Sequence, residues 1–77
     1  RDIVTLKKDA ILYHPGGPKI PDWVKGKNYG VAKTQVSGKD IVKGGEKCVL
    51  LGEYIDENGN AQGNIMTWTA VSNLETI

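Results

Sequence analysis

The chain has 77 residues, of which 39% are hydrophobic and 25% charged, so it has the size and composition of one small globular domain. Ten Lys and Arg residues against nine Asp and Glu give a net charge of +1, which predicts little attraction for nucleic acid. A single Cys excludes an internal disulfide, one Cys and one His cannot build a Cys/His zinc site, and no apolar run reaches the roughly 20 residues that span a bilayer.

The first third of the chain predicts two short strands and a long loop. Ile3–Leu6 and residues 10–13 are apolar and partly β-branched, and residues 7–9 between them are typical of a turn. Residues 14–18 contain two prolines, which cannot donate backbone hydrogen bonds, so we expect a loop there. Residues 20–24 should continue this loop as an extended segment.

The middle of the chain predicts two further strands. Residues 29–36 alternate between two sets of side chains, which is typical of a strand. Residues 47–54 form an apolar run that indicates a central strand, with Cys48 as a buried, inert thiol. The glycine-rich stretch between them, residues 37–45, is predicted to be mostly loop, in which residues 41–42 pair briefly.

The last third of the chain predicts a hairpin followed by short elements. An Asn-Gly pair within a turn at residues 56–60 is a strong signal for a tight hairpin. Residues 65–69 predict another strand, and residues 71–73 one turn of 3₁₀ helix. The chain is then expected to end on a short strand at residues 74–76.

These elements together predict an all-β fold. Five or six short antiparallel strands, a long early loop and the absence of α-helical patterns favour a small barrel, because a barrel pairs its own strand edges around one core. A domain of this size must bury nearly all of its apolar side chains to be stable. The predicted core consists of Val4, Leu6, Ile11, Val31, Val36, Val49, Leu51, Ile65 and Leu74.

The order of several short motifs is similar to that of a known family. The run from Ile20 to Lys25 reads Ile-Pro-Asp-Trp-Val-Lys and precedes Tyr29-Gly-Val, and a Val-Leu-Leu strand begins at Val49. Thr-Trp-Thr around Trp68 and a final Asn-Leu at Leu74 complete the order. The chain resembles the bacterial SH3-like (SH3b) domains at the C-termini of peptidoglycan hydrolases and phage endolysins. In that family the motif that corresponds to Thr-Trp-Thr reads Ser-Trp-Val, and the stretches 37–46 and 56–64 are shorter.

The resemblance implies an SH3-like barrel that binds the bacterial cell wall and catalyses nothing itself. Residues 1–77 would then be one binding domain, forming the C-terminal part of a longer hydrolase. Its partners would be a cell-wall polymer such as peptidoglycan and the upstream catalytic domain, which it concentrates on the substrate. Extra copies in a homo-oligomer would add affinity. We expect no cofactor, no metal, no nucleic acid and no membrane partner. The parent protein would act at the wall, after release from the host cytoplasm during phage lysis or after secretion.

The candidate ligand contacts are the aromatic side chains and their polar neighbours, because sugars and peptides stack on aromatic faces while polar groups fix their orientation. Trp23 has two interpretations, a ligand contact in the long loop or a side chain that closes the barrel. Trp68 is either the far wall of the groove or part of the core, and Tyr54 either lines the groove or lies at a subunit contact. The candidate set is Tyr13, His14, Lys19, Asp22, Trp23, Tyr29, Tyr54 and Trp68.

Two other binding functions remain open as alternatives. SH3-type domains read Pro-rich peptides, but they use acidic loops, whereas this early loop carries mainly Lys. A small barrel could also bind single-stranded nucleic acid by stacking bases on Trp23, Tyr29 and Trp68, although the near-zero net charge argues against it. A catalytic role is not expected, because the sequence contains no recognisable nucleophile motif for which His14 could act as the general base.

Overall fold

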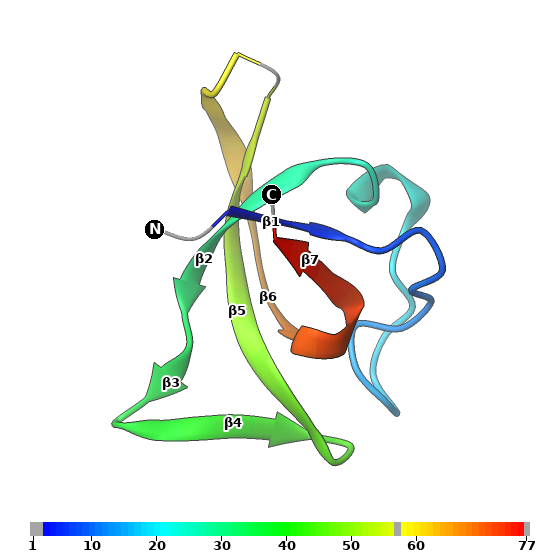
Figure 1. Cartoon of the computed structure of the whole chain (residues 1–77), viewed down its shortest axis with the longest axis vertical. Coiled ribbons are helices and arrows are strands. Elements are labelled where there is room, and N and C mark those ends of the chain that lie inside the picture. Colours follow the sequence, from blue (N-terminus) through cyan, green and yellow to red (C-terminus); the bar gives the residue numbers. More distant parts are fainter. Residues whose placement is uncertain (1–2, 57, 77) are drawn as a thin grey trace.

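The computed structural model describes residues 3–56 and 58–76, and it is built almost entirely of β-strands (Figure 1). The 3₁₀ turns are η1 (Asp22–Val24) and η2 (Val71–Asn73), and no described helix is long and apolar enough to cross a membrane. The strands are β1 (Ile3–Leu6), β2 (Asn28–Lys33), β3 (Gln35–Val36), β4 (Lys39–Lys43), β5 (Glu46–Ile55), β6 (Ala61–Ala70) and β7 (Leu74–Thr76).

All seven strands belong to one antiparallel sheet, in which the long strand β5 is the organising element. The strand order is β3-β4-β5-β2-β1-β7, and β6 also pairs with β5. Strand β6 leads through η2 into β7, which pairs with β1, so the chain itself connects β6, at the side of β5, with the β1–β7 end of the sheet (Figure 1). The all-β, barrel-like architecture is therefore confirmed, with its long early loop and its 3₁₀ turn at residues 71–73, but it has seven strands rather than five or six.

Two tight turns create strand β4, which the sequence prediction treated mostly as loop. In the β3–β4 turn, Ser37 and Gly38 have φ angles of 51° and 77°, and in the β4–β5 turn Gly44 and Gly45 have 59° and 82°. Two consecutive residues with positive φ are the signature of the hairpin turn whose twist matches that of the flanking strands. The prediction of a loop over most of residues 37–45 was therefore wrong, because its Ser-Gly and Gly-Gly pairs form hairpin turns, whereas the pairing expected at residues 41–42 is confirmed.

Two other local predictions in the first half were also wrong. Residues 10–13 form no strand, and they contribute one isolated bridge between Leu12 and Lys19 that closes the early loop on itself. Residues 20–24 are not extended throughout, because they include η1. The strand predicted at residues 29–36 exists but is interrupted at Thr34, where the chain leaves β5 and pairs with β4 instead.

The hairpin predicted at residues 56–60 joins β5 to β6, and one of its residues, Glu57, lies outside the described residues. The backbone N–H of Gly59 donates to the carbonyl of Asp56 at 3.0 Å, and Gly59 has a φ of 83°. Register between β5 and β6 runs from Cys48 opposite Ala70 to Ile55 opposite Ala61. This pair of ten-residue strands is the longest ladder in the molecule.

The core lies between β5 and the strands and early loop that curl around it. Four of the predicted core residues are buried and three more are half-buried against them, which confirms the predictions for Val4, Leu6, Val49, Leu51, Val31, Ile65 and Leu74. Ile11 and Val36 are not core, since 63% and 42% of their surface is exposed. Ile11 lies in the early loop where no strand forms, and Val36 lies on β3, which pairs only with β4.

Candidate functional site

Two of the predicted ligand contacts are core side chains instead. Tyr29 is 0% exposed, and Tyr13 is buried as well. Both rings pack inside the barrel, in the same cluster as Leu51 and Ile20. Their faces are therefore not open to a ligand, and the prediction that they contact one was wrong. A chain without Phe has few large rings, so its tyrosines fill the core.

Trp23 lies at the surface because its neighbour takes the buried position. The turn η1 begins after Pro21, and Val24 is its buried residue. The Tyr29 hydroxyl donates a 2.6 Å hydrogen bond to the Val24 carbonyl, which fastens the turn to the core. Trp23, one position earlier, is directed outward and remains 57% exposed. Of its two interpretations, closing the barrel is wrong, because more than half of the side chain is in solvent.

Tyr54 connects this exposed tryptophan to the core. Its ring centroid lies 6.2 Å from that of Trp23 and 6.4 Å from that of Tyr29, and both pairs meet edge to face at 71°. Such edge-to-face contacts are favourable because the positive edge of one ring meets the negative face of the other. The Lys27 ammonium group lies 5.4 Å from the Tyr54 centroid, within the range of a cation–π contact.

A hollow of about 380 Å³ opens beside Tyr54 and carries several polar groups. Its lining residues are Gly26, Lys27, Asn28, Tyr54, Ile55, Asp56 and Gln62. Oδ1 of Asp56 accepts hydrogen bonds from the backbone N–H groups of Asn58 and Asn60 at 2.9 Å each, and Oδ2 accepts one from Nε2 of Gln62 at 2.7 Å. The carboxylate is therefore held in one orientation. We call Trp23, Lys27, Tyr54 and this hollow the Trp23 surface.

Lys27, Asn28, Asp56 and Gln62 were not among the predicted contacts. They meet because Asn28 on β2 lies opposite Ile55 on β5, and because the β5–β6 hairpin folds residue 62 back toward residue 56. The first relation joins residues far apart in the sequence, whereas the second lies within one hairpin. The signals in the sequence were this hairpin and the lysine-rich segment at residues 25–27, next to Trp23.

The remaining loop candidates lie apart from one another. Lys19 and Asp22 are exposed, and neither lines the hollow beside Tyr54. His14 lines a different hollow, of about 370 Å³, between the early loop and η2. Its ring Nδ1 is 3.2 Å from the carbonyl oxygen of Pro15, and the nearby Asn73 amide donates to the Leu12 carbonyl at 2.7 Å. The structure does not bring His14 together with Trp23.

Trp68 lies on the opposite face of the sheet. Val49 and Leu51 belong to one core cluster, and side chains alternate along a strand, so Leu50 between them lies on the other face of β5, where it is also buried. Trp68 is directly opposite Leu50 in the β5–β6 register, and directly opposed side chains share a face. Trp68 is half-buried there. It is therefore not a wall of the hollow beside Tyr54.

The Trp23 surface combines an open indole face, a cation, a fixed carboxylate and side-chain amides. The described residues contain no group of three or more His, Cys, Asp or Glu that could hold a metal ion. No protein-family model, curated protein or solved structure matches this chain.

Proposed function

We propose that this domain binds a polymer of the bacterial cell wall through the Trp23 surface and holds an attached peptidoglycan hydrolase on its substrate. The observation that carries the proposal is the exposed indole of Trp23, supported from behind by Tyr54. Large aromatic side chains are favoured in contact regions because they offer a rigid apolar face at a small cost in side-chain entropy.

The chemistry of the surface matches the chemistry of such a polymer. Sugar rings and short peptides present C–H groups that pack on an indole face, together with hydroxyl, amide and carboxylate groups. Around Tyr54 the hollow offers the Lys27 ammonium for carboxylates and the amides of Asn28 and Gln62 for hydroxyl and amide groups. A shallow site of this size binds weakly by itself, because few groups are desolvated.

Weak binding is sufficient for a tether. A catalytic domain linked to the bound module has a local concentration at the wall that is set by the linker, so its reaction no longer depends on free diffusion to the polymer. Additional copies of the module would increase the residence time multiplicatively. In this proposal the domain acts outside the host membrane, at the wall, as part of a phage-encoded or secreted hydrolase.

The test is binding of the fluorescently labelled domain to purified sacculi from several Gram-positive species. Trp23→Ala should weaken binding by about tenfold, which corresponds to about 1.4 kcal/mol, and Trp23→Phe should weaken it less because an aromatic face remains. Val42→Ala is the matched control, since Val42 is similarly exposed, at 60%, but lies on β4. Wild-type protein that decorates no sacculi, or Trp23→Ala binding like wild type, would refute the proposal.

A further inference from the structure

We propose that Asn58 is a site of spontaneous covalent modification, at which its side-chain amide is converted to a carboxylate by deamidation through a cyclic imide. Asn58 is one of five asparagines in the chain and the one that is followed by glycine. It is exposed, in the β5–β6 hairpin whose residues line the hollow beside Tyr54. The product changes the groups that hold Asp56 and thereby alters the Trp23 surface.

The reaction closes a ring between neighbouring residues and needs water as its co-reactant. The backbone nitrogen of Gly59 attacks Cγ of Asn58, so a new C–N bond forms, and the amide group leaves as ammonia together with the proton that the nitrogen gives up. Water then opens the imide at either of its two carbonyl carbons. One opening gives aspartate, and the other gives isoaspartate, in which the main chain runs through the side-chain carbon.

The surroundings of Gly59 leave room for this ring. Gly59 is exposed, and the space that a Cβ would occupy has no atom within 4 Å. Glycine also reaches backbone conformations that are closed to other residues, which eases ring closure. The other four asparagines precede residues whose side chains hinder the attacking nitrogen, namely Tyr29, Ala61, Ile65 and Leu74. They are internal references for the reactivity of Asn58.

Asp56 restrains the reaction in the folded protein. Its carbonyl accepts a 3.0 Å hydrogen bond from the Gly59 N–H, which is the attacking group, and its Oδ1 accepts the N–H groups of Asn58 and Asn60 at 2.9 Å each. The Asp56 N–H donates in return to the Asn60 carbonyl at 3.0 Å. While these four bonds hold, the Gly59 nitrogen is engaged. Attack therefore requires local opening of the turn, and the free energy of that opening sets the rate.

Isoaspartate at position 58 cannot keep all four bonds. It inserts one methylene group into the main chain before Gly59, inside the loop that the bonds between Asp56 and Asn60 close. Either product also places a new carboxylate next to that of Asp56, and the two charges repel. Oδ2 of Asp56 holds Nε2 of Gln62 at 2.7 Å, and both residues line the hollow. A rearranged turn therefore changes the hollow.

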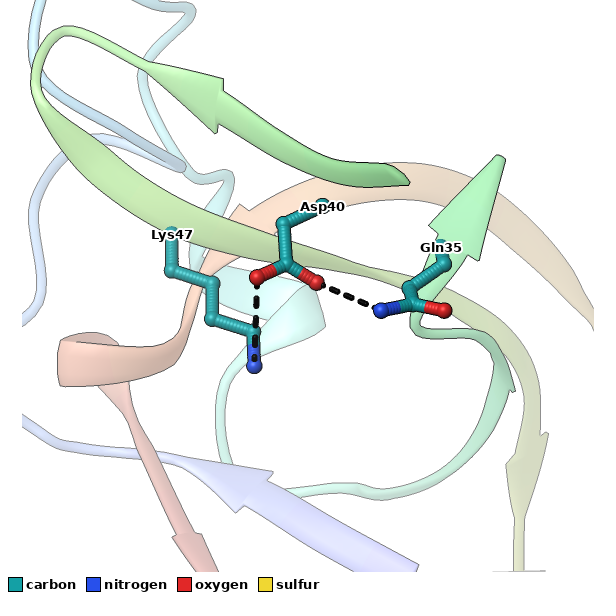
Figure 2. Close-up of polar contacts among 3 residues, drawn as sticks. All are labelled: Gln35, Asp40 and Lys47. Carbon is teal, nitrogen blue, oxygen red and sulfur yellow. Dashed lines mark hydrogen bonds and ion pairs between the residues drawn. The ribbon is translucent and has the colours of Figure 1, made fainter. Parts of the chain in front are cut away.

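Asp40 provides a matched control in the β3–β4 hairpin. Its Oδ1 accepts a 2.9 Å hydrogen bond from Nε2 of Gln35, and its Oδ2 lies 4.0 Å from the Lys47 ammonium (Figure 2). These partners are side chains, whereas the partners of Asp56 include the backbone of the turn at Asn58. Replacing either carboxylate breaks a bond to a glutamine amide, but only Asp56→Ala releases the turn that carries Asn58.

The test is incubation of the intact domain at mildly alkaline pH, followed by peptide mass mapping and enzymatic methylation of isoaspartate. Asn58 should react at least about tenfold faster than any other asparagine, and about tenfold faster again in urea, where the turn is open. Asp56→Ala should raise the rate in the folded domain by about fivefold, because the bonds that close the turn are lost, whereas Asp40→Ala should change it by less than about twofold. Thermal melts establish that both variants are folded during the incubation.

A second readout follows the consequence for the hollow. After incubation, the Asn60 N–H of the wild type should exchange with solvent about tenfold faster than that of Asn58→Gln, whose longer side chain closes the ring slowly. The incubated wild type should also bind sacculi more weakly than Asn58→Gln, and this loss alone rests on the function proposed above.

An unmodified Asn58, equal rates in the two alanine variants, or an Asn60 N–H that exchanges equally slowly after modification would each overturn the inference. Sacculus binding that is unchanged by complete modification would refute its effect on the Trp23 surface. If fresh wild type binds no sacculi, the proposed function fails, while the mass and exchange results still decide whether Asn58 is modified as described.

Discussion

The hydroxyl of Tyr29 fastens the turn that presents Trp23 to the core, and Tyr29→Phe removes this hydroxyl alone. The side chain is completely buried, and its hydroxyl donates to the Val24 carbonyl at 2.6 Å. Phe retains the ring, so the packing against Leu51 and the edge contact with Tyr54 should persist. What is lost is one buried hydrogen bond.

The expected cost is about 2 kcal/mol at neutral pH. Removing the donor of a buried hydrogen bond leaves its acceptor desolvated and unpaired, which costs about 1–3 kcal/mol. For a domain of this size each kcal/mol lowers the melting temperature by roughly 4–8 °C, so Tyr29→Phe should melt roughly 8–16 °C below wild type. Because the turn then loses an anchor, the Trp23 surface should also bind sacculi more weakly.

Because of the same hydroxyl, the free energy of unfolding of the wild type should decrease as the pH rises above 10. Burial, followed by the nearby Tyr13 and Tyr54, raises the pKa of Tyr29 from 10.0 to about 12. The unfolded chain therefore loses this proton above pH 10, whereas the folded protein keeps it until about pH 12. The contribution to stability is present in full below pH 10 and is lost between pH 10 and 12. The loss of stability amounts to about 1.4 kcal/mol at pH 11 and about 2.3 kcal/mol at pH 12.

Urea unfolding of both proteins at pH 8, 10 and 11 measures both effects. The free-energy difference between wild type and Tyr29→Phe should be about 2 kcal/mol at pH 8 and should shrink by about 1.4 kcal/mol at pH 11, because Phe has no proton to lose. Titrating groups that do not interact with Tyr29 affect both proteins alike. Equal stabilities at pH 8, or a difference that stays constant up to pH 11, would show that the hydroxyl is not buried and bonded as described.

Three further predictions concern packing and reactivity. Leu51→Ala should lower the free energy of unfolding by about 2–5 kcal/mol in urea titrations, whereas Val42→Ala, at an exposed position, should change it by less than about 0.5 kcal/mol; comparable losses would contradict the assigned core. Gly44→Ala should destabilise the domain by at least about 1 kcal/mol, because φ is 59° there and an added Cβ would meet the carbonyl oxygen of Pro15; an unchanged melting temperature would refute that contact. The Cys48 thiol, whose pKa is raised by burial, should react with a thiol reagent only in denaturant, and rapid reaction of the native protein would contradict its burial.

Local signals in the sequence were sufficient for several elements. The strand Ile3–Leu6, the 3₁₀ turn Val71–Asn73, the final strand and the turn at residues 56–60 are where the pattern predicted them. Each depends on neighbours within a few residues, such as the Asn-Gly pair that favours a tight turn. The same kind of signal existed for β4, in Ser37-Gly38 and Gly44-Gly45, but the prediction assigned most of residues 37–45 to a loop.

The sequence by itself determined that this chain is a small all-β domain, because alternation, turn residues and the scarcity of helix formers are properties of short segments. It did not determine which aromatic side chains face solvent. Tyr29 and Trp23 lie six residues apart in similarly apolar surroundings, yet one is wholly buried and the other is 57% exposed. The pairing of β2 with β1 and β5 places Tyr29 in the core, whereas η1 directs Val24 into the core and leaves Trp23 outside. Both outcomes depend on packing against residues far apart in the chain, which no local pattern encodes.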